Sequence, residues 1–306
     1  MSNLLRLPIG SIYAISAHVL WGLFPLYWKL LSDIQPLPLV CHRIVWSFVV
    51  LSLMVPFLWR GNSDPTQIQP STHLRDRKIW LVYGFAGILL AINWLAFLWA
   101  VNNGAILQAS LGYYINPLIS VLLGVVLLGE RLAALHWLAI AIVTAGVAVM
   151  TVAGGGLPWV SLAMAVSFSL YALVKKGGRL PSLPGLWVEM MVLAPISLGY
   201  LFYIESQGSG AMRTAPPITW MLLFGGGFVT VLPLALFSSA AKTVSLSMMG
   251  ILQYVGPTLQ FLVGVLIFRE DFSSGRMWGF ALVWLGVGLY LSHSFRSSRP
   301  HGKKRL

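Results

Sequence analysis

Apolar residues run through this chain in long, continuous stretches, which short clusters of Gly, Pro and charged residues interrupt. An α-helix needs about 20 apolar residues to cross the hydrocarbon core of a bilayer, whereas a membrane β-barrel would show alternating segments of roughly 10 residues. The continuous stretches therefore favour helices. The interruptions predict ten spans, at residues 9–31, 37–59, 79–101, 105–128, 133–152, 157–176, 184–204, 218–240, 245–268 and 276–293.

The composition indicates a membrane protein and excludes a soluble one. Of the 306 residues, 58% are hydrophobic and 9% are charged, and the mean hydropathy is +0.81. A soluble domain carries about 25% charged residues. We therefore predict an all-α integral membrane protein. The single cysteine, Cys41, excludes an intramolecular disulfide and a multi-cysteine metal site, and the sequence predicts no metal and no cofactor.

The net charge of +12 would suit a nucleic-acid-binding protein, but the basic residues lie in the loops between spans and in the tail 296–306. We therefore expect this tail to face anionic membrane lipid and expect no nucleic-acid partner. With the N-terminus inside, the cytoplasmic segments hold fifteen Lys and Arg residues, Lys175 and Lys176 among them, and the outside loops hold three. Because cytoplasmic loops are the more basic ones, both termini are predicted to be cytoplasmic.

The chain also contains an internal repeat. Residues 112–132 align with residues 252–272, 140 positions later, and six of the 21 aligned positions are identical. The identical positions include Tyr114/Tyr254, Pro117/Pro257 and Glu130/Glu270. Each half holds five predicted spans, an odd number, so the second half must be inverted in the membrane. The predicted organisation is a five-helix repeat over residues 1–152, an inverted five-helix repeat over 153–295, and a basic cytoplasmic tail over 296–306.

Two stretches are more specific: WGLFPLYWKLL over Trp21–Leu31 and HRIVWS over His42–Ser47. Together with the repeat and the paired Pro/Glu helices, they resemble the EamA-domain branch of the drug/metabolite transporter superfamily, and within it the RarD family. The resemblance covers essentially the whole chain. It implies ten helices and a multi-pass carrier of the bacterial inner membrane, usually an exporter, that works by alternating access. It implies no substrate, since the family's link to chloramphenicol sensitivity is a label and not an activity.

Aromatic and amide side chains are interleaved in the deeper parts of several spans. Amides in hydrocarbon must face protein or water, and aromatic surfaces beside amide groups suit a mid-sized, partly aromatic organic solute. Any one of these residues could instead pack between helices or hydrogen-bond a neighbouring helix. The candidate substrate pocket consists of His18, Trp21, Phe24, Asn93, Trp94, Gln108, Tyr113, Tyr114, Asn116, Phe168, Tyr171, Gln253, Tyr254 and Gln260.

A charged residue at the centre of a span costs about 2.5–3.5 kcal/mol on insertion scales, so each one is expected to have a structural or functional role. Arg43 lies in the second predicted span and Glu189 in the seventh, where a repeat offset of 147 places Glu189 opposite His42. We expect these two charges to line opposite vestibules without pairing. Snorkelling of Arg43 and a structural hydrogen bond of Glu189 are the alternatives. Glu189 is also the candidate proton-coupling group, and Lys29 either anchors the interface or attracts an anionic substrate.

Pro117 and Pro257 lie inside otherwise continuous apolar stretches. Because proline lacks an N–H and frees the carbonyl four residues earlier, the two residues are predicted to kink the fourth and ninth helices symmetrically. Glu130 and Glu270 end the same two helices, where hydrogen bonding at a helix end is the expected role of each.

A secondary transporter of a small molecule competes with two other functions. A membrane enzyme would need several acids or a His/Asp cluster to hold a metal or activate water, and this chain has one deep acid, so we predict no enzyme. A lipid or lipid-carrier flippase could share the fold, but it would need a groove open to the bilayer. P-loop and dinucleotide motifs are absent, so a gradient would drive transport. One chain with two repeats can form a complete carrier as a monomer, and the sequence leaves the oligomeric state open.

Overall fold

A computed structural model describes residues 8–60, 75–102, 106–153, 159–210, 215–267 and 274–297. Over these ranges the chain forms helices joined by short turns, and no strand occurs among them. The helices are α1 (Ile9–Trp28), the 3-10 turn η1 (Lys29–Leu31), α2 (Pro36–Arg60), α4 (Arg77–Asn102), α5 (Ile106–Leu128), α6 (Ala134–Ala153), α7 (Trp159–Gly177), α8 (Ser182–Ser206), α9 (Pro217–Thr243), α10 (Leu246–Leu252), α11 (Val255–Leu266) and α12 (Ser274–Ser297).

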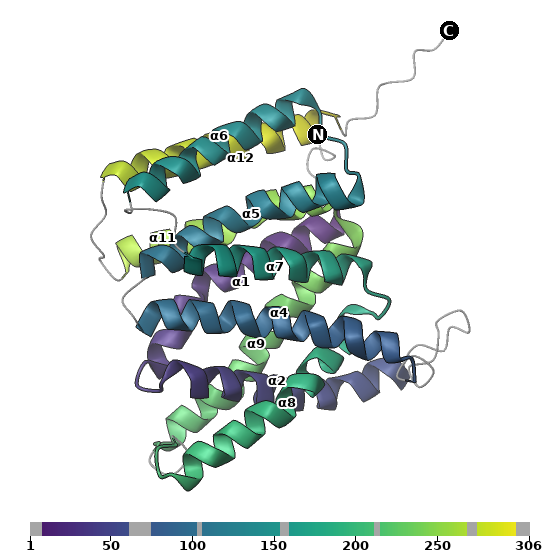
Figure 1. The fold of residues 1–306 in the computed structure, drawn as a ribbon, viewed down its shortest axis with the longest axis vertical. Helices are drawn as coiled ribbons and strands as arrows, with labels where there is room; N and C mark the ends of the chain where they lie inside the picture. The colour runs from purple at the N-terminus through teal and green to yellow at the C-terminus, as the bar shows by residue number, and fades with distance from the viewer. Residues whose placement is uncertain are drawn as a thin grey trace, which may run out of the picture.

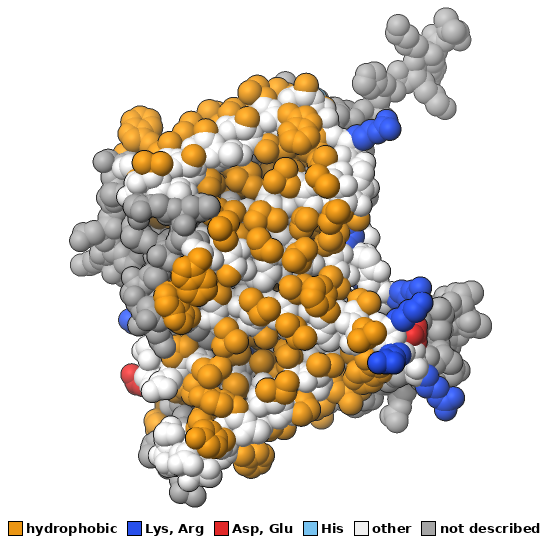
Figure 2. Space-filling model, in the orientation of Figure 1, with side chains coloured by type: hydrophobic (Ala, Val, Ile, Leu, Met, Phe, Trp, Pro, Cys, Tyr) orange, Lys and Arg blue, Asp and Glu red, His pale blue; other side chains and the backbone are white. Residues whose placement is uncertain are grey.

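The helices have the length and the surface of membrane spans. Eight described segments are long and apolar enough to cross a bilayer, and two shorter apolar segments, Gly112–Leu128 and Met277–His293, lie in α5 and α12. Hydrophobic side chains cover the face shown in Figure 2, and Lys and Arg side chains gather at its edge. The exposed residues Arg75, Arg77, Lys78 and Arg179 lie at one end of the bundle, which we call the basic end. The predicted all-α membrane class is confirmed.

Most helix pairs join one helix from before residue 153 to one from after it. The helices lie side by side in a stack, with α6 and α12 at one edge and α2 and α8 at the other (Figure 1). Between these edges, α5 packs on α7 and α10, while α1 packs on α9 and α11. The two halves of the chain are therefore interleaved and share one core.

Glycines allow the close approach of α6 and α12. A Cβ on Gly146 would lie 2.7 Å from the Gly279 carbonyl oxygen, and one on Gly286 would lie 2.7 Å from the Ala139 carbonyl oxygen. Gly286 stands 140 residues after Gly146, and Gly279 stands 140 residues after Ala139. The two close approaches thus use equivalent positions of the two halves. Small residues in such positions let membrane helices pack backbone to backbone.

The two proline-containing segments differ in the structure. The chain around Pro257 is divided into α10 and α11, whereas α5 runs through Pro117 as one α-helix. Pro257 cannot donate to the carbonyl of Gln253, four residues earlier, and that carbonyl accepts from the Gly256 N–H at 3.1 Å instead. Gln253 and Tyr254 form the turn between the two helices. The segment predicted as one ninth helix is therefore a discontinuous one.

We predict that Gly146→Val destabilises the protein, because the added side chain would push α6 away from α12. Overpacking of this kind costs about 1–3 kcal/mol and should lower the melting temperature of the purified protein in detergent. Gly288→Val on α12 is the matched control, since a Cβ at Gly288 has no neighbour within 4 Å in the described part of the chain. Equal melting temperatures for the two variants would contradict the assigned contact.

Candidate functional site

Two aromatic pairs lie where the halves of the chain meet, and each pair joins equivalent positions of the predicted repeats. Tyr114 of α5 and Tyr254 stand 140 residues apart in sequence, and their ring centroids are 6.3 Å apart. The Tyr254 hydroxyl donates to the Tyr114 carbonyl oxygen at 3.2 Å. Trp21 of α1 and Phe168 of α7 stand 147 residues apart, with centroids at 5.5 Å. Each pair therefore brings together two positions that the predicted repeat makes equivalent.

Phe237 of α9 completes this aromatic group, and sequence reasoning missed it. Its fully buried ring lies 5.5 Å from Trp21 and 5.1 Å from Phe168, and it stacks on Tyr171 at 6.1 Å. His18 meets Trp21 and Phe237 edge-on, at 5.1 and 5.9 Å. The His18 Nδ1 lies 2.6 Å from a backbone carbonyl one turn earlier in α1. Five of the group's rings thus come from α1, α7 and α9.

Polar groups without partners lie beside the tyrosine pair. Gln253, in the turn between α10 and α11, is 3% exposed, and neither its Oε1 nor its Nε2 has a hydrogen-bond partner among the described residues. The buried Tyr114 hydroxyl also has none there. A buried polar group left unpaired costs about 1–3 kcal/mol. The turn therefore offers unpaired donors and acceptors next to aromatic surface, as a binding site for a polar organic molecule requires.

The other predicted amides bond neighbouring helices. Asn93 of α4 donates to a backbone carbonyl of α7 at 2.9 Å, and Asn116 of α5 accepts from a serine of α7 at 2.6 Å. Gln260 of α11 donates to the backbone carbonyl of Trp21 at 3.1 Å. The side chain of Gln108 lies outside the described residues. Tyr113 packs against a phenylalanine of α4, with ring centroids 6.0 Å apart. Gln253 is thus the amide that the described helices leave open.

Arg43 of α2 is buried in a separate aromatic environment nearer the end opposite the basic end. Its guanidinium carbon lies 4.5 Å from the Trp28 ring and 4.3 Å from the Trp94 ring, with Phe24 at 5.9 Å. Its Nε donates to Thr230 Oγ1 of α9 at 3.2 Å, and the residue is 7% exposed. The side chain therefore points among helices rather than toward the surface of the bundle.

Glu189 of α8 pairs with Lys175 of α7, and both side chains are buried. Lys175 Nζ lies 2.6 Å from Glu189 Oε1, with side-chain exposures of 1% and 0%, and the Tyr171 hydroxyl donates to Glu189 Oε2 at 3.2 Å. Lys175, which the charge count assigned to the cytoplasmic side, lies in the last turn of α7 with its side chain buried. The sequence did place a lysine 14 residues before the only deep acid, at the end of the preceding span. Burial of one charge demands such a partner.

Glu130 binds the start of α10 at the basic end. Its Oε1 accepts from the Leu246 N–H at 2.6 Å and its Oε2 accepts from the Ser247 N–H at 2.9 Å. A carboxylate at a helix N-terminus pairs with free N–H groups and with the positive end of the dipole. This contact joins the first half of the chain to the second. Glu270 lies outside the described residues, and Lys29 is exposed at the opposite end.

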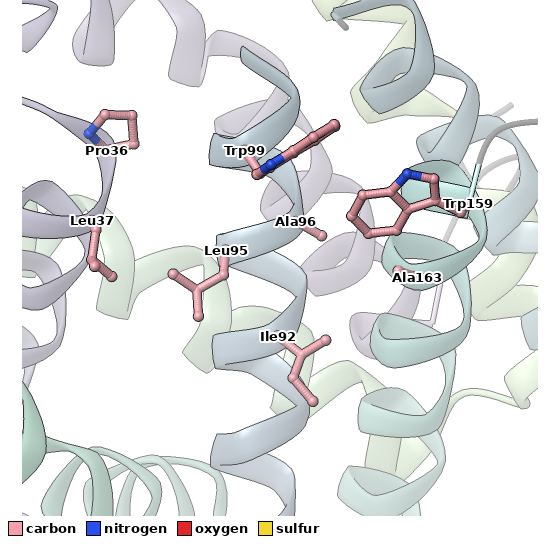
Figure 3. Close-up of a pocket in the computed structure, with 8 residues that line it drawn as sticks. All are labelled: Pro36, Leu37, Ile92, Leu95, Ala96, Trp99, Trp159 and Ala163. Carbon is pink, nitrogen blue, oxygen red and sulfur yellow. The ribbon is translucent and has the colours of Figure 1, made fainter. Parts of the chain in front are cut away.

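A groove of about 470 Å³ opens on the side of the bundle between α2, α4 and α7 (Figure 3). Trp99 and Trp159 lie across it with ring centroids 5.0 Å apart. All eight lining residues are apolar: Pro36, Leu37, Ile92, Leu95, Ala96, Trp99, Trp159 and Ala163. None of them belongs to the predicted pocket, and Trp99 and Trp159, near the ends of α4 and α7, are typical of an interfacial aromatic belt.

Comparison with known proteins identifies relatives over nearly the whole chain. The model of the EamA-like transporter family matches twice, over residues 8–152 and 155–292. The chain is 43% identical to the "Uncharacterized transporter YojE" of Bacillus subtilis, covering 95% of this chain and 97% of that protein. It is 35% identical to "Protein RarD" of Escherichia coli, covering 96% and 97%. A crystal structure of a protein 20% identical in sequence matches 93% of this chain and 98% of its own, with a TM-score of 0.70, which shows the same fold.

We predict that Glu189→Gln strongly destabilises the protein, because Lys175 is then buried without a counter-charge. Breaking a buried pair costs about 3–5 kcal/mol, whereas replacing both charges by apolar residues is often neutral. Thermal unfolding in detergent should therefore show a large loss for Glu189→Gln and recovery in Lys175→Met/Glu189→Leu. Asp76→Asn is the control, since Asp76 and Arg179 form an exposed pair at 3.9 Å. A double variant no more stable than Glu189→Gln would refute this account.

We predict that Glu130→Gln loosens the basic end. The amide keeps one acceptor oxygen and loses the charge, and hydrogen bonds to a charged group contribute about 1.5–3 kcal/mol. In a Cys41→Ser background, a cysteine placed by Ser247→Cys, at a position 1% exposed, should react with a maleimide at least about tenfold faster once Glu130 is Gln. Glu205→Gln, at the opposite end of α8, should leave the rate unchanged. Equal rates with Glu and Gln at position 130 would show that the contact does not hold this end closed.

Proposed function

The chain belongs to the EamA-like transporter family and is a relative of RarD, so it is a multi-pass membrane transporter, and we propose that it exports a small organic metabolite or drug across the bacterial inner membrane. On this proposal transport proceeds by alternating access between two inverted five-helix repeats, residues 1–152 and 153–295. Both termini are cytoplasmic, the tail 296–306 faces anionic lipid, and one chain suffices for transport.

The packing of the helices supports the inverted repeats. The family model matches each half separately. Helix α1 of the first half packs on α9 and α11 of the second, and its equivalent α7 packs on α4 and α5 of the first. Two further pairs, α2 with α8 and α6 with α12, each join a helix to its equivalent in the other half. Two halves of opposite orientation that pack in this way can exchange their conformations, which opens one end and closes the other.

The unpaired amide of Gln253 is the observation that carries the proposal. Gln253 lies in the turn that interrupts the helix between α10 and α11. It is next to Tyr254, and Tyr254 and Tyr114 stand at equivalent positions of the two halves. Secondary transporters built from inverted repeats typically bind substrate at discontinuous helices near the interface between the repeats. Tyr114 and Tyr254 supply aromatic surface, and the aromatic group around Trp21 and Phe237 extends it.

Contacts at the basic end support a state closed on the cytoplasmic side. Glu130 binds the N-terminus of α10, and the Tyr83 hydroxyl accepts from the Leu180 N–H at 2.8 Å. Each contact joins the two halves, so opening this end must break both. A proton delivered to Glu189 would break its pair with Lys175, which makes Glu189 the candidate group through which a proton gradient acts.

The side groove does not favour a lipid flippase. A lipid headgroup crossing the bilayer would need polar groups along its path. The groove between α2, α4 and α7 has an entirely apolar lining, and Gln253 is not part of it. The polar groups without partners lie inside the bundle, which favours a solute over a lipid.

Flux measurements test the proposed function. Inverted vesicles from cells that overproduce the protein are given a filtered cytoplasmic extract, and the compounds that accumulate are identified by mass spectrometry. We expect at least one organic metabolite to accumulate in these vesicles and not in vesicles without the protein. A folded protein that moves no compound in either direction, while it binds a partner protein, would refute the carrier.

Gln253→Leu separates a transport role from a structural one. Removing an unpaired buried amide should leave the melting temperature unchanged or raised, while flux of the accumulating compound falls at least tenfold. Gln260→Leu is the matched control, because Gln260 makes a hydrogen bond to the Trp21 carbonyl and its loss should lower the melting temperature. Normal flux through Gln253→Leu would remove Gln253 from the site.

A further inference from the structure

Arg43 carries a charge that the described protein does not neutralise. Of the described acids, Glu130 binds α10, Glu189 pairs with Lys175, and Asp76 pairs with Arg179, while neither Asp33 nor Glu205 forms an ion pair with Arg43. No carboxylate pairs with Arg43 anywhere in the described ranges. A cation inside a membrane protein is costly and normally meets an acid or backbone carbonyls. Something other than these side chains must therefore supply the negative charge at Arg43 during the protein's cycle.

The surroundings of Arg43 leave one edge of the guanidinium available. Trp28 and Trp94 lie 4.5 and 4.3 Å from the guanidinium carbon, where cation–π contact stabilises the charge but accepts no conventional hydrogen bond. The Nε–H is used by Thr230 at 3.2 Å. The N–H groups on the two Nη atoms have no acceptor in the described structure. These in-plane donors form the fork that binds a carboxylate with two parallel hydrogen bonds.

One face of α1 connects the surroundings of Arg43 with the aromatic group at the centre. Trp21, Phe24 and Trp28 are spaced at i, i+3 and i+7 on α1, so they share one face of the helix. Trp28 and Phe24 contact the Arg43 guanidinium, and Trp21 contacts Phe168 and Phe237. An organic molecule with its anionic end at Arg43 would place its body along this aromatic face.

We propose that Arg43 binds the carboxylate of the transported molecule, so that the substrate is an organic acid with an aromatic or apolar body. This inference rests on the proposed transport function. A single guanidinium matches one singly charged carboxylate. A phosphate monoester, which carries more charge, would need a second cation, and the described residues place none beside Arg43.

Thermal-shift titration of the full-length protein in detergent tests the assignment. The probes are matched pairs, benzoate with benzamide and indole-3-acetate with indole-3-acetamide, together with inorganic phosphate. We expect the carboxylates to raise the melting temperature and the amides and phosphate to leave it unchanged. Arg43→Gln should weaken carboxylate binding at least tenfold. Arg43→Lys should weaken it less, because it keeps the charge but loses the fork. Arg179→Gln, which removes an exposed arginine, is the control and should bind as the unchanged protein does.

Three results would overturn the assignment: amides that bind as well as the carboxylates, carboxylate binding retained in Arg43→Gln, or no carboxylate binding up to tens of millimolar. If Arg43→Gln does not fold, Thr230→Val tests the assignment instead. This variant keeps the arginine charge but removes the hydrogen bond that holds the guanidinium in its orientation. Thr230→Val should weaken carboxylate binding several-fold, and unchanged binding counts against the proposal. The titration does not depend on transport. If carboxylates fail to bind but the vesicles still accumulate a compound, the Arg43 site is refuted and the transport function is not. If carboxylates bind but no compound moves in the vesicles, the transport function is refuted and the binding site is not.

Discussion

A polar group buried in a bilayer must find its partner inside the protein, and this requirement organises the whole structure. It selects helices, which satisfy their own backbones, and it decides where polar side chains can lie. Asn93 and Asn116 meet it by bonding α7, and Glu130 meets it at the start of α10. Each of these bonds joins the first half of the chain to the second. Gln253, whose buried amide has no partner among the described residues, and the free edge of Arg43 do not meet it, and the proposed function assigns both to a ligand.

The two halves are equivalent in packing and unequal in detail. Trp21 meets Phe168 and Tyr114 meets Tyr254, as equivalent positions would across an axis. The segment around Pro257 is nevertheless divided while α5 is continuous. In an alternating-access carrier the halves adopt different conformations at any moment and exchange them during the cycle. The inequality between α5 and the pair α10 and α11 supports that mechanism, because the same sequence pattern forms both arrangements.

Sequence alone could predict the helices but not how the charges meet. Apolar runs long enough to cross a bilayer indicate where helical segments lie, although the run predicted as the ninth helix is divided into α10 and α11. Pro117 and Pro257 carry the same local pattern, so only packing around each could decide which segment divides. Lys175 lies at a span end, where a lysine can reach water or turn inward, and its pairing with Glu189 depends on how α7 meets α8. Phe237 lies in a continuous apolar stretch, so nothing in the sequence distinguishes it from its neighbours. Only the packing of α9 on α1 shows that its ring contacts His18 and Trp21.

The distribution of charge inside the bundle also bears on selectivity. Lys175 and Glu189 cancel each other, so Arg43 leaves the described interior with one uncompensated positive charge. At low dielectric a second cation beside Arg43 would be repelled far more strongly than in water. A neutral molecule would leave the guanidinium fork unpaired, whereas a carboxylate would satisfy it. On the proposed assignment the site thus rejects cations by repulsion and disfavours neutral compounds by unpaired hydrogen bonds, so that its preference for organic acids arises from both attraction and exclusion.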